Sequence, residues 1–129
     1  MSLQSVDERN PQETGVLFQT ADGTNKKIAF TPAKAGSRVD AISVLAVAAA
    51  DKTMAVDLHT GAAYTTLSQI IVPANSGLGA IRALDLLSLL PVPLQQGFAL
   101  PYGTDLYLSM AVALTGTDSV QVVVLGGDF

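Results

Sequence analysis

The chain has 129 residues, a formal net charge of -4 and a pI near 4.6. This length fits one domain, and the acidic balance argues against nucleic-acid binding, which needs a basic footprint. The absence of cysteine excludes disulfides and thiolate metal sites. No membrane-spanning helix is expected either, because the charge-free run at residues 86–104 contains three prolines.

Charged side chains are scarce and unevenly spread. They make up 14% of the residues, whereas an average soluble domain carries about 25%. Residues 1–60 hold thirteen of them and residues 61–129 only five. We therefore expect part of the surface to be covered by other subunits or by a larger particle. The alternative is a compact β-sandwich whose surface is made of serine, threonine and glutamine.

The N-terminal residues 1–14 are polar, show no apolar periodicity and contain an Asn-Pro pair. They predict an extended arm, either disordered alone or ordered against a neighbouring subunit. A single domain over residues 15–129 follows. Residues 16–20 are a short strand candidate, and the Asp-Gly pair in the next turn, residues 21–24, predicts a hairpin with the strand after it.

Four further strands are predicted in the first half of the chain from period-two alternation or β-branched content: residues 25–31, 38–47, 53–59 and 64–72. In the first of them we expect Ile28 and Phe30 to face the core. In the third, Asp57 and His59 are expected to point outward. Residues 41–50 are rich in alanine and also fit a helix, but their β-branched neighbours favour a strand.

The second half of the chain contains an ambiguous segment and a terminal pair of strands. Residues 80–90 fit either a strand or a short helix ended by Pro91. Residues 104–114 alternate, residues 115–118 form a turn, and residues 120–125 are apolar on both faces. We therefore expect a terminal hairpin whose second strand is central in its sheet or covered by a neighbouring subunit.

The spacing of the predicted elements decides the fold class. About eight strands at intervals of roughly 8–12 residues predict an all-β protein, an antiparallel β-sandwich or jelly roll with an extended N-terminal arm. A parallel α/β sheet needs a crossover helix between its strands, and only one helix candidate exists.

No residue pattern indicates catalysis or a cofactor. His59 is the only histidine, and a His59–Asp57 pair without a nucleophile is more typical of surface hydrogen bonding. Zinc needs three or four ligands that this chain lacks, and residues 22–25 lack the distal carboxylate of a calcium loop. Residues 76–82 have arginine in place of the third glycine of a dinucleotide-binding loop. We therefore expect a non-enzymatic protein without metal or cofactor.

One basic cluster stands out near the start of the domain: Lys26, Lys27, Lys34 and Arg38. Such a cluster is usually a solvated face. The sharper hypothesis is that it docks onto an acidic protein surface, where charge complementarity sets the register of binding. The edges of the sheets are a second candidate interface, because a sandwich can extend a sheet into a neighbour by strand addition.

Five short segments carry a family resemblance: residues 35–42 (AGSRVDAI), 56–61 (VDLHTG), 71–74 (IVPA), Leu94 with residues 97–100 (GFAL), and 124–129 (VLGGDF). Together they resemble a family of small virion proteins of tailed bacteriophages. The similarity extends from Thr31 to the C-terminus and is clearest in the closing GGDF. It implies a jelly-roll or sandwich module that decorates or cements the capsid.

The resemblance implies a homotrimer or dimer bound over the joints between subunits of the major capsid protein. The protein would be made in the host bacterial cytoplasm and would end on the surface of the phage head. In this hypothesis the basic cluster docks on the capsid and the arm links subunits. One alternative is a tail or baseplate adaptor or fibre-associated module. A lesser one is a carbohydrate-binding β-sandwich, which the absence of tryptophan disfavours.

Overall fold

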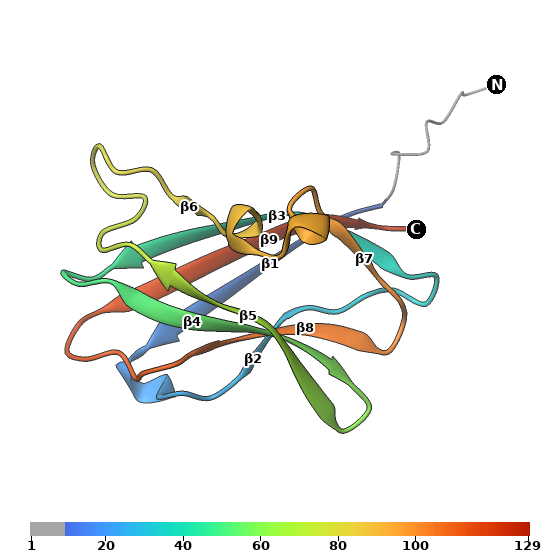
Figure 1. The fold of residues 1–129 in the computed structure, drawn as a ribbon, viewed down its shortest axis with the longest axis horizontal. Helices are drawn as coiled ribbons and strands as arrows, with labels where there is room; N and C mark the ends of the chain where they lie inside the picture. The colour runs from blue at the N-terminus through green and yellow to red at the C-terminus, as the bar shows by residue number, and fades with distance from the viewer. Residues whose placement is uncertain (1–9) are drawn as a thin grey trace.

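The computed structural model describes residues 10–129, which form two antiparallel β-sheets packed face to face (Figure 1). One sheet has five strands and the other has four. The predicted β-sandwich is therefore confirmed. Its helical content is limited to three short 3-10 turns, at Thr20–Asp22 (η1), Leu86–Leu89 (η2) and Val92–Leu94 (η3).

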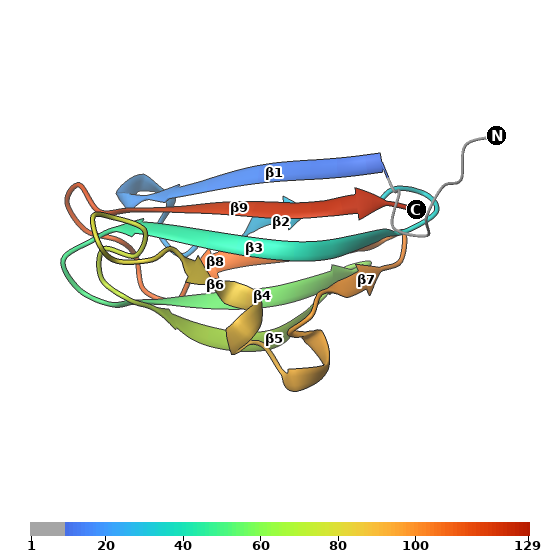
Figure 2. The same cartoon turned by 90° about the horizontal axis from the view of Figure 1, so that it is seen from above.

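The five-stranded sheet, called sheet A below, is built on three long strands that lie side by side (Figure 2). Its central strand β9 pairs with β1 on one side and with β3 on the other. Two short strands, β6 and β7, pair with different parts of β3. The bounds are Asn10–Gln19 (β1), Ser119–Asp128 (β9), Ser37–Val47 (β3), Leu84–Asp85 (β6) and Phe98–Leu100 (β7).

The four-stranded sheet, called sheet B, has the order β2-β8-β4-β5. Strands β4 and β5 form a hairpin in which Thr60 pairs with Ala63. This hairpin agrees with the strands predicted at residues 53–59 and 64–72. The bounds are Lys27–Phe30 (β2), Thr104–Met110 (β8), Lys52–Thr60 (β4) and Ala63–Val72 (β5).

The core lies between the two sheets and is filled by alternate residues of the long strands. This arrangement follows from the period of two, which sends every second side chain to the same face of a strand. The segment from η2 to η3 adds leucines at one side of this core (Figure 2). The largest fully buried side chains include Phe18, Phe30, Ile42, Met54, Leu86, Leu106, Leu108, Met110 and Leu114.

The predicted terminal hairpin is wrong, because its two strands lie in different sheets. Strand β8 pairs with β2 and β4 in sheet B, and β9 pairs with β1 and β3 in sheet A. The connection at residues 111–118 crosses from one sheet to the other. The same error applies to the Asp-Gly turn, since β1 and β2 also lie in different sheets. A short turn between two strands predicts a hairpin only when both bury the same face of one sheet. The prediction that β9 is central is confirmed.

The first strand begins earlier than the predicted residue 16. Strand β1 starts at Asn10, so residues 10–14 of the predicted arm belong to sheet A. Residues 1–9, the rest of that arm, lie outside the described residues. The start of β1 has no apolar alternation because it is a sheet edge whose polar Gln12 donates a hydrogen bond to Asp128. Pro11 is compatible with this edge position, where no partner strand needs its missing N–H.

Two local predictions also change. Residues 80–90, left open between strand and helix, form the short strand β6 followed by the 3-10 turn η2. Ile28, expected in the core, is 48% exposed, whereas Ala29 and Phe30 are fully buried. A bulge between Ile28 and Phe30 shifts the register against β8. A bulge places two consecutive residues opposite one, so the simple alternation fails there.

Candidate interaction surfaces

The outer face of sheet A is poor in charge over most of its three long strands. Its charged residues lie towards its margins: Asp85 of β6 is opposite Ser43, and Arg38 and Asp40 lie at one end of β3. The side chains that point away from the core on β1, β9 and β3 form rows across the sheet: Gln19–Ser119–Val47, Leu17–Gln121–Leu45, Gly15–Val123–Ser43 and Glu13–Leu125–Ala41. Glu13, on the edge strand, is the one charged residue in these four rows. Leu17, Val47 and Leu125 are each 42–45% exposed. We call these four rows the uncharged face.

The outer face of sheet B has a different chemistry, because three aromatic rings meet on it. The ring centroid of His59 lies 4.4 Å from that of Tyr64 and 5.3 Å from that of Tyr107. The two tyrosine rings are 5.2 Å apart in an edge-to-face arrangement, a geometry that aromatic pairs prefer. Burial raises the pKa of the Tyr107 hydroxyl, and the neighbouring Tyr64 and Asp105 raise it further. We call these three rings the aromatic cluster.

Asp57 lies beside the aromatic cluster and is fully buried, contrary to the expectation of an outward, solvated pair with His59. Its register partner on β8 is Tyr107, and its side chain is 0% exposed. One carboxylate oxygen pairs with the ammonium of Lys26. The Lys26 Nζ atom also lies 5.1 Å from the centroid of the Tyr64 ring. Lys26 therefore pairs with a carboxylate that strand alternation alone would leave in water. The other oxygen, Oδ1, has no hydrogen-bond partner among residues 10–129.

The four residues of the predicted basic cluster do not form one free patch. Lys26 pairs with Asp57 at the start of β2. Lys27 contacts the carboxylate of Asp22 at 3.0 Å. Arg38 is on β3, in the other sheet, where it pairs with Asp40 at 3.3 Å and donates to the carbonyl of Gln96 at 2.9 Å. Lys34 is exposed in the loop between β2 and β3. Internal carboxylates thus neutralise three of the four charges, and the docking role of the cluster stays a prediction.

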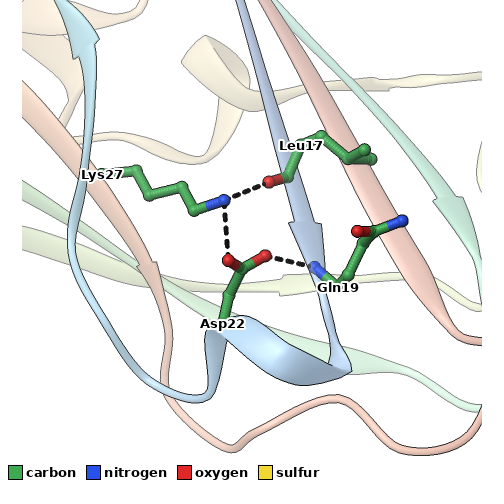
Figure 3. A network of polar contacts seen from close by, with 4 residues as sticks. All are labelled: Leu17, Gln19, Asp22 and Lys27. Carbon is green, nitrogen blue, oxygen red and sulfur yellow. Dashed lines mark hydrogen bonds and ion pairs between the residues drawn. The ribbon is translucent and has the colours of Figure 1, made fainter.

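Lys27 and Asp22 together satisfy two backbone groups on the open edge of β1 (Figure 3). Lys27 Nζ donates to the carbonyl of Leu17 at 2.6 Å, and the Gln19 N–H donates to the Asp22 carboxylate at 2.7 Å. These two backbone groups flank Phe18 and point away from β9. A neighbouring strand would otherwise be needed to satisfy them. We call the Asp22–Lys27 pair the edge clamp.

The edge clamp predicts a measurable pH dependence of stability. The Gln19 N–H and the Lys27 ammonium hold the pKa of Asp22 below its ordinary value of 3.8. A group with a lowered folded pKa stabilises the fold above its unfolded pKa and loses that contribution as the pH falls through the folded pKa. We expect Asp22→Asn to melt at a lower temperature than wild type at about pH 6, with the two melting temperatures converging towards about pH 2.5. A difference that stays constant over this range would contradict the assignment.

The closing residues of the chain tie three strands together. The Asp128 carboxylate of β9 accepts hydrogen bonds from Gln12 Nε2 of β1 at 2.7 Å and from Ser37 Oγ of β3 at 2.6 Å. The Phe129 N–H donates to the carbonyl of Gly36 at 3.0 Å. Gly126 pairs with Val39 of β3, next to the bulge in that strand. The Phe30 ring lies 3.0 Å from the position that a Cβ atom on Gly126 would take. These contacts hold the closing GGDF segment in place at the end of sheet A.

Two cavities flank β6, of about 460 Å³ and about 260 Å³. The larger lies beside the loop at residues 76–82 and is lined by Pro73, Ser76 and Arg82 among others. Ser76 is buried, and its hydroxyl donates to the carbonyl of Pro73 at 2.7 Å, so its side chain serves the loop. Between residues 10 and 129 no group of three or more His, Asp or Glu side chains is placed to hold a metal ion. No helix in the same range is long and apolar enough to cross a membrane.

No family model matches the chain, and no curated protein or solved structure matches it either.

Sequence reasoning missed both of these surfaces for the same reason. Each depends on strand order, which brings residues distant in sequence into one row. The uncharged face had a detectable signal, because alternate residues of one strand, residues 41, 43, 45 and 47, carry no charge on the side that faces outward. The aromatic cluster had none, since Tyr64 and Tyr107 lie on strands that are separated by β4.

Proposed function

We propose that this chain is a non-enzymatic structural protein of a virion, of the capsid decoration (cement) type, which binds over joints between major capsid protein subunits. The observation that carries the proposal is the uncharged face of sheet A. The resemblance to small virion proteins of tailed bacteriophages indicates which kind of particle the chain would belong to. Its role there would be to stabilise the surface of the phage head.

The uncharged face supports an assembly role because its composition suits contact with protein better than contact with water. An antiparallel sheet with one solvated face normally alternates apolar residues inward with polar or charged residues outward. Here Leu17, Val123 and Leu125 occupy outward positions of sheet A. Burying such side chains contributes roughly 25 cal/mol per Å² of apolar area. An apolar centre with polar surroundings is also the usual anatomy of a protein interface.

A cement protein acts by number rather than by the strength of one contact. Each copy adds a modest interface between neighbouring capsid subunits, and many copies raise the free energy needed to separate the shell. The outer face of sheet B and the exposed Lys34 remain available for the capsid when the uncharged face is occupied. Among the four predicted docking residues, Lys34 is the one that keeps its charge for a partner.

Two other functions make different predictions. A tail or baseplate module would share the fold and the faces, so only its position and copy number in the particle separate it from a cement protein. A carbohydrate-binding function is favoured by one observation, the aromatic cluster beside a carboxylate with Tyr64 46% exposed, because sugars stack on aromatic rings. A glycan array probed with the purified protein tests this function, and specific hits abolished by Tyr64→Ala would favour it.

Quantitative mass spectrometry of purified particles tests the proposed function. Phage particles from the source culture are purified by density gradient, and this chain is quantified against the major capsid protein. We expect a copy number of the same order as that of the major capsid protein. A copy number as low as that of tail proteins would move the chain to the tail. Absence from the particle would overturn the virion assignment itself.

A further inference from the structure

The first observation is that the open edge of β1 is partly blocked against strand addition. The edge clamp already satisfies the Leu17 carbonyl and the Gln19 N–H. Alternate residues of a strand point their backbone groups to the same side, so Pro11 and Glu13 face this edge too. Proline offers no N–H there, and a charged edge residue is a common guard against pairing with another chain. A second copy of the chain therefore gains little by adding its strand to β1.

The second observation is the size and shape of the uncharged face. The four rows span seven residues on each of three strands. With strands about 4.8 Å apart and a rise of about 3.3 Å per residue, they present a plane of roughly 330 Å² in projection. Two such planes brought together remove roughly 660 Å² from water before the relief of the side chains is added. This area lies below the lower limit of about 1,000 Å² for specific interfaces, so the expected association is weak.

The third observation is that this face suits a copy of itself. A two-fold axis brings the same patch of both subunits together, so any charge near the axis would meet its own copy. On β1, β9 and β3 the central rows of the face, from Leu17 to Leu45 and from Gly15 to Ser43, contain no charge, and Asp85 continues the second row at its margin on β6. Glu13 is at the margin, on the edge strand. Uncharged aliphatic side chains can therefore be buried on both sides without opposing like charges.

We propose that two copies of the chain pack uncharged face to uncharged face about a two-fold axis that passes near the middle of β9. Sheets packed in this way lie about 10 Å apart. The dimer has a dissociation constant of about micromolar or weaker. This inference rests on the proposed function only for the expectation that the face has a partner. The association itself is measured with purified protein and without any particle.

Site-specific crosslinking tests the geometry, because the natural chain has no cysteine. Gln121→Cys places one thiol on β9 at the centre of the uncharged face, and Thr66→Cys places one on the exposed outer strand of sheet B. A short bismaleimide is used, because a disulfide is too short to join two sheets about 10 Å apart. We expect Gln121→Cys to give covalent dimers in high yield and Thr66→Cys to give few. Equal yields, or the reverse order, would overturn the proposal.

Sedimentation equilibrium provides the second measurement, with a matched pair of substitutions. Leu125 and Ile71 are both exposed aliphatic residues in strands, 44% and 59% exposed, on different sheets. Wild type and Ile71→Glu are expected to dimerise with rising concentration, whereas Leu125→Glu stays monomeric with an unchanged circular dichroism spectrum. A monomeric wild type up to about 1 mM, weaker than any dimer expected of such an area, would overturn the proposal. So would a Leu125→Glu dimer as tight as wild type. If this dimer does not form, the copy number in purified particles still decides the proposed function separately.

Discussion

Replacing Gly126 with alanine is expected to destabilise the fold by about 3 kcal/mol, at the upper end of the usual cost of overpacking. The added Cβ would overlap the backbone carbonyl of Arg38 on the neighbouring strand β3 and approach the buried Phe30 ring to 3.0 Å. Backbone atoms cannot turn away as a flexible side chain can, so β9 and β3 must separate locally. Chemical denaturation followed by circular dichroism measures the loss.

Gly15→Ala is the matched control, since Gly15 is in the adjacent strand of the same sheet. No heavy atom lies within 4 Å of the position of its Cβ. Alanine there loses less chain entropy on folding, so its effect should be neutral or stabilising by about 0.5 kcal/mol. If the free energy of unfolding of Gly126→Ala stayed within about 0.5 kcal/mol of the wild-type value, the close approach of β9 to the β3 bulge would not exist in solution.

Replacing Lys26 with methionine is the second large change, with an expected loss of about 2 kcal/mol. Removing one partner of a fully buried ion pair costs about 3–5 kcal/mol, and we reduce this figure because the Lys26 side chain is 37% exposed. The cost arises because Asp57, which is 0% exposed, would keep a buried charge with nothing to balance it. Thermal and urea unfolding of the variant at neutral pH measure the effect.

Lys26 and Asp57 differ in burial, so removing one should change the free energy of unfolding more than removing the other. Asp57→Asn should cost less than Lys26→Met, because an unpaired Lys26 can turn into water whereas an unpaired Asp57 carboxylate cannot. Lys34→Met, at an exposed position, is the control for loss of a lysine and should be nearly neutral. The double variant Lys26→Met/Asp57→Asn should cost less than the sum of the single changes. Equal costs for the two single variants would contradict the burial of Asp57.

The fold class was predictable because a period of two survives in nearly every long strand. Val120, Val122 and Val124 alternate on β9, and Leu106, Leu108 and Met110 alternate on β8. Alternation states which side of a strand is buried, but it carries no information on which sheet holds the strand. The two predicted hairpins failed at this point, because β8 and β9 bury their apolar sides against the same core from opposite sheets.

The surfaces were less predictable than the fold because side chains reorganise them. Asp57 alternates to the outside of its strand and is nevertheless buried, and it pairs with Lys26, whose ammonium also lies against the Tyr64 ring. The basic cluster was read from nearness in sequence, yet Arg38 lies in a different sheet from Lys26. The low charge of the chain predicts that some surface suits a partner, and strand order makes the outer face of sheet A the surface that we propose.

An electron cryomicroscopy reconstruction of the intact particle tests the central claim most directly, because it places the subunit and both of its faces at once. We predict density for this β-sandwich on the outer surface of the head, over joints between capsid subunits, with the uncharged face of sheet A buried against a second copy. A particle in which this chain is absent from the head, or in which sheet A faces solvent in every copy, would contradict the account.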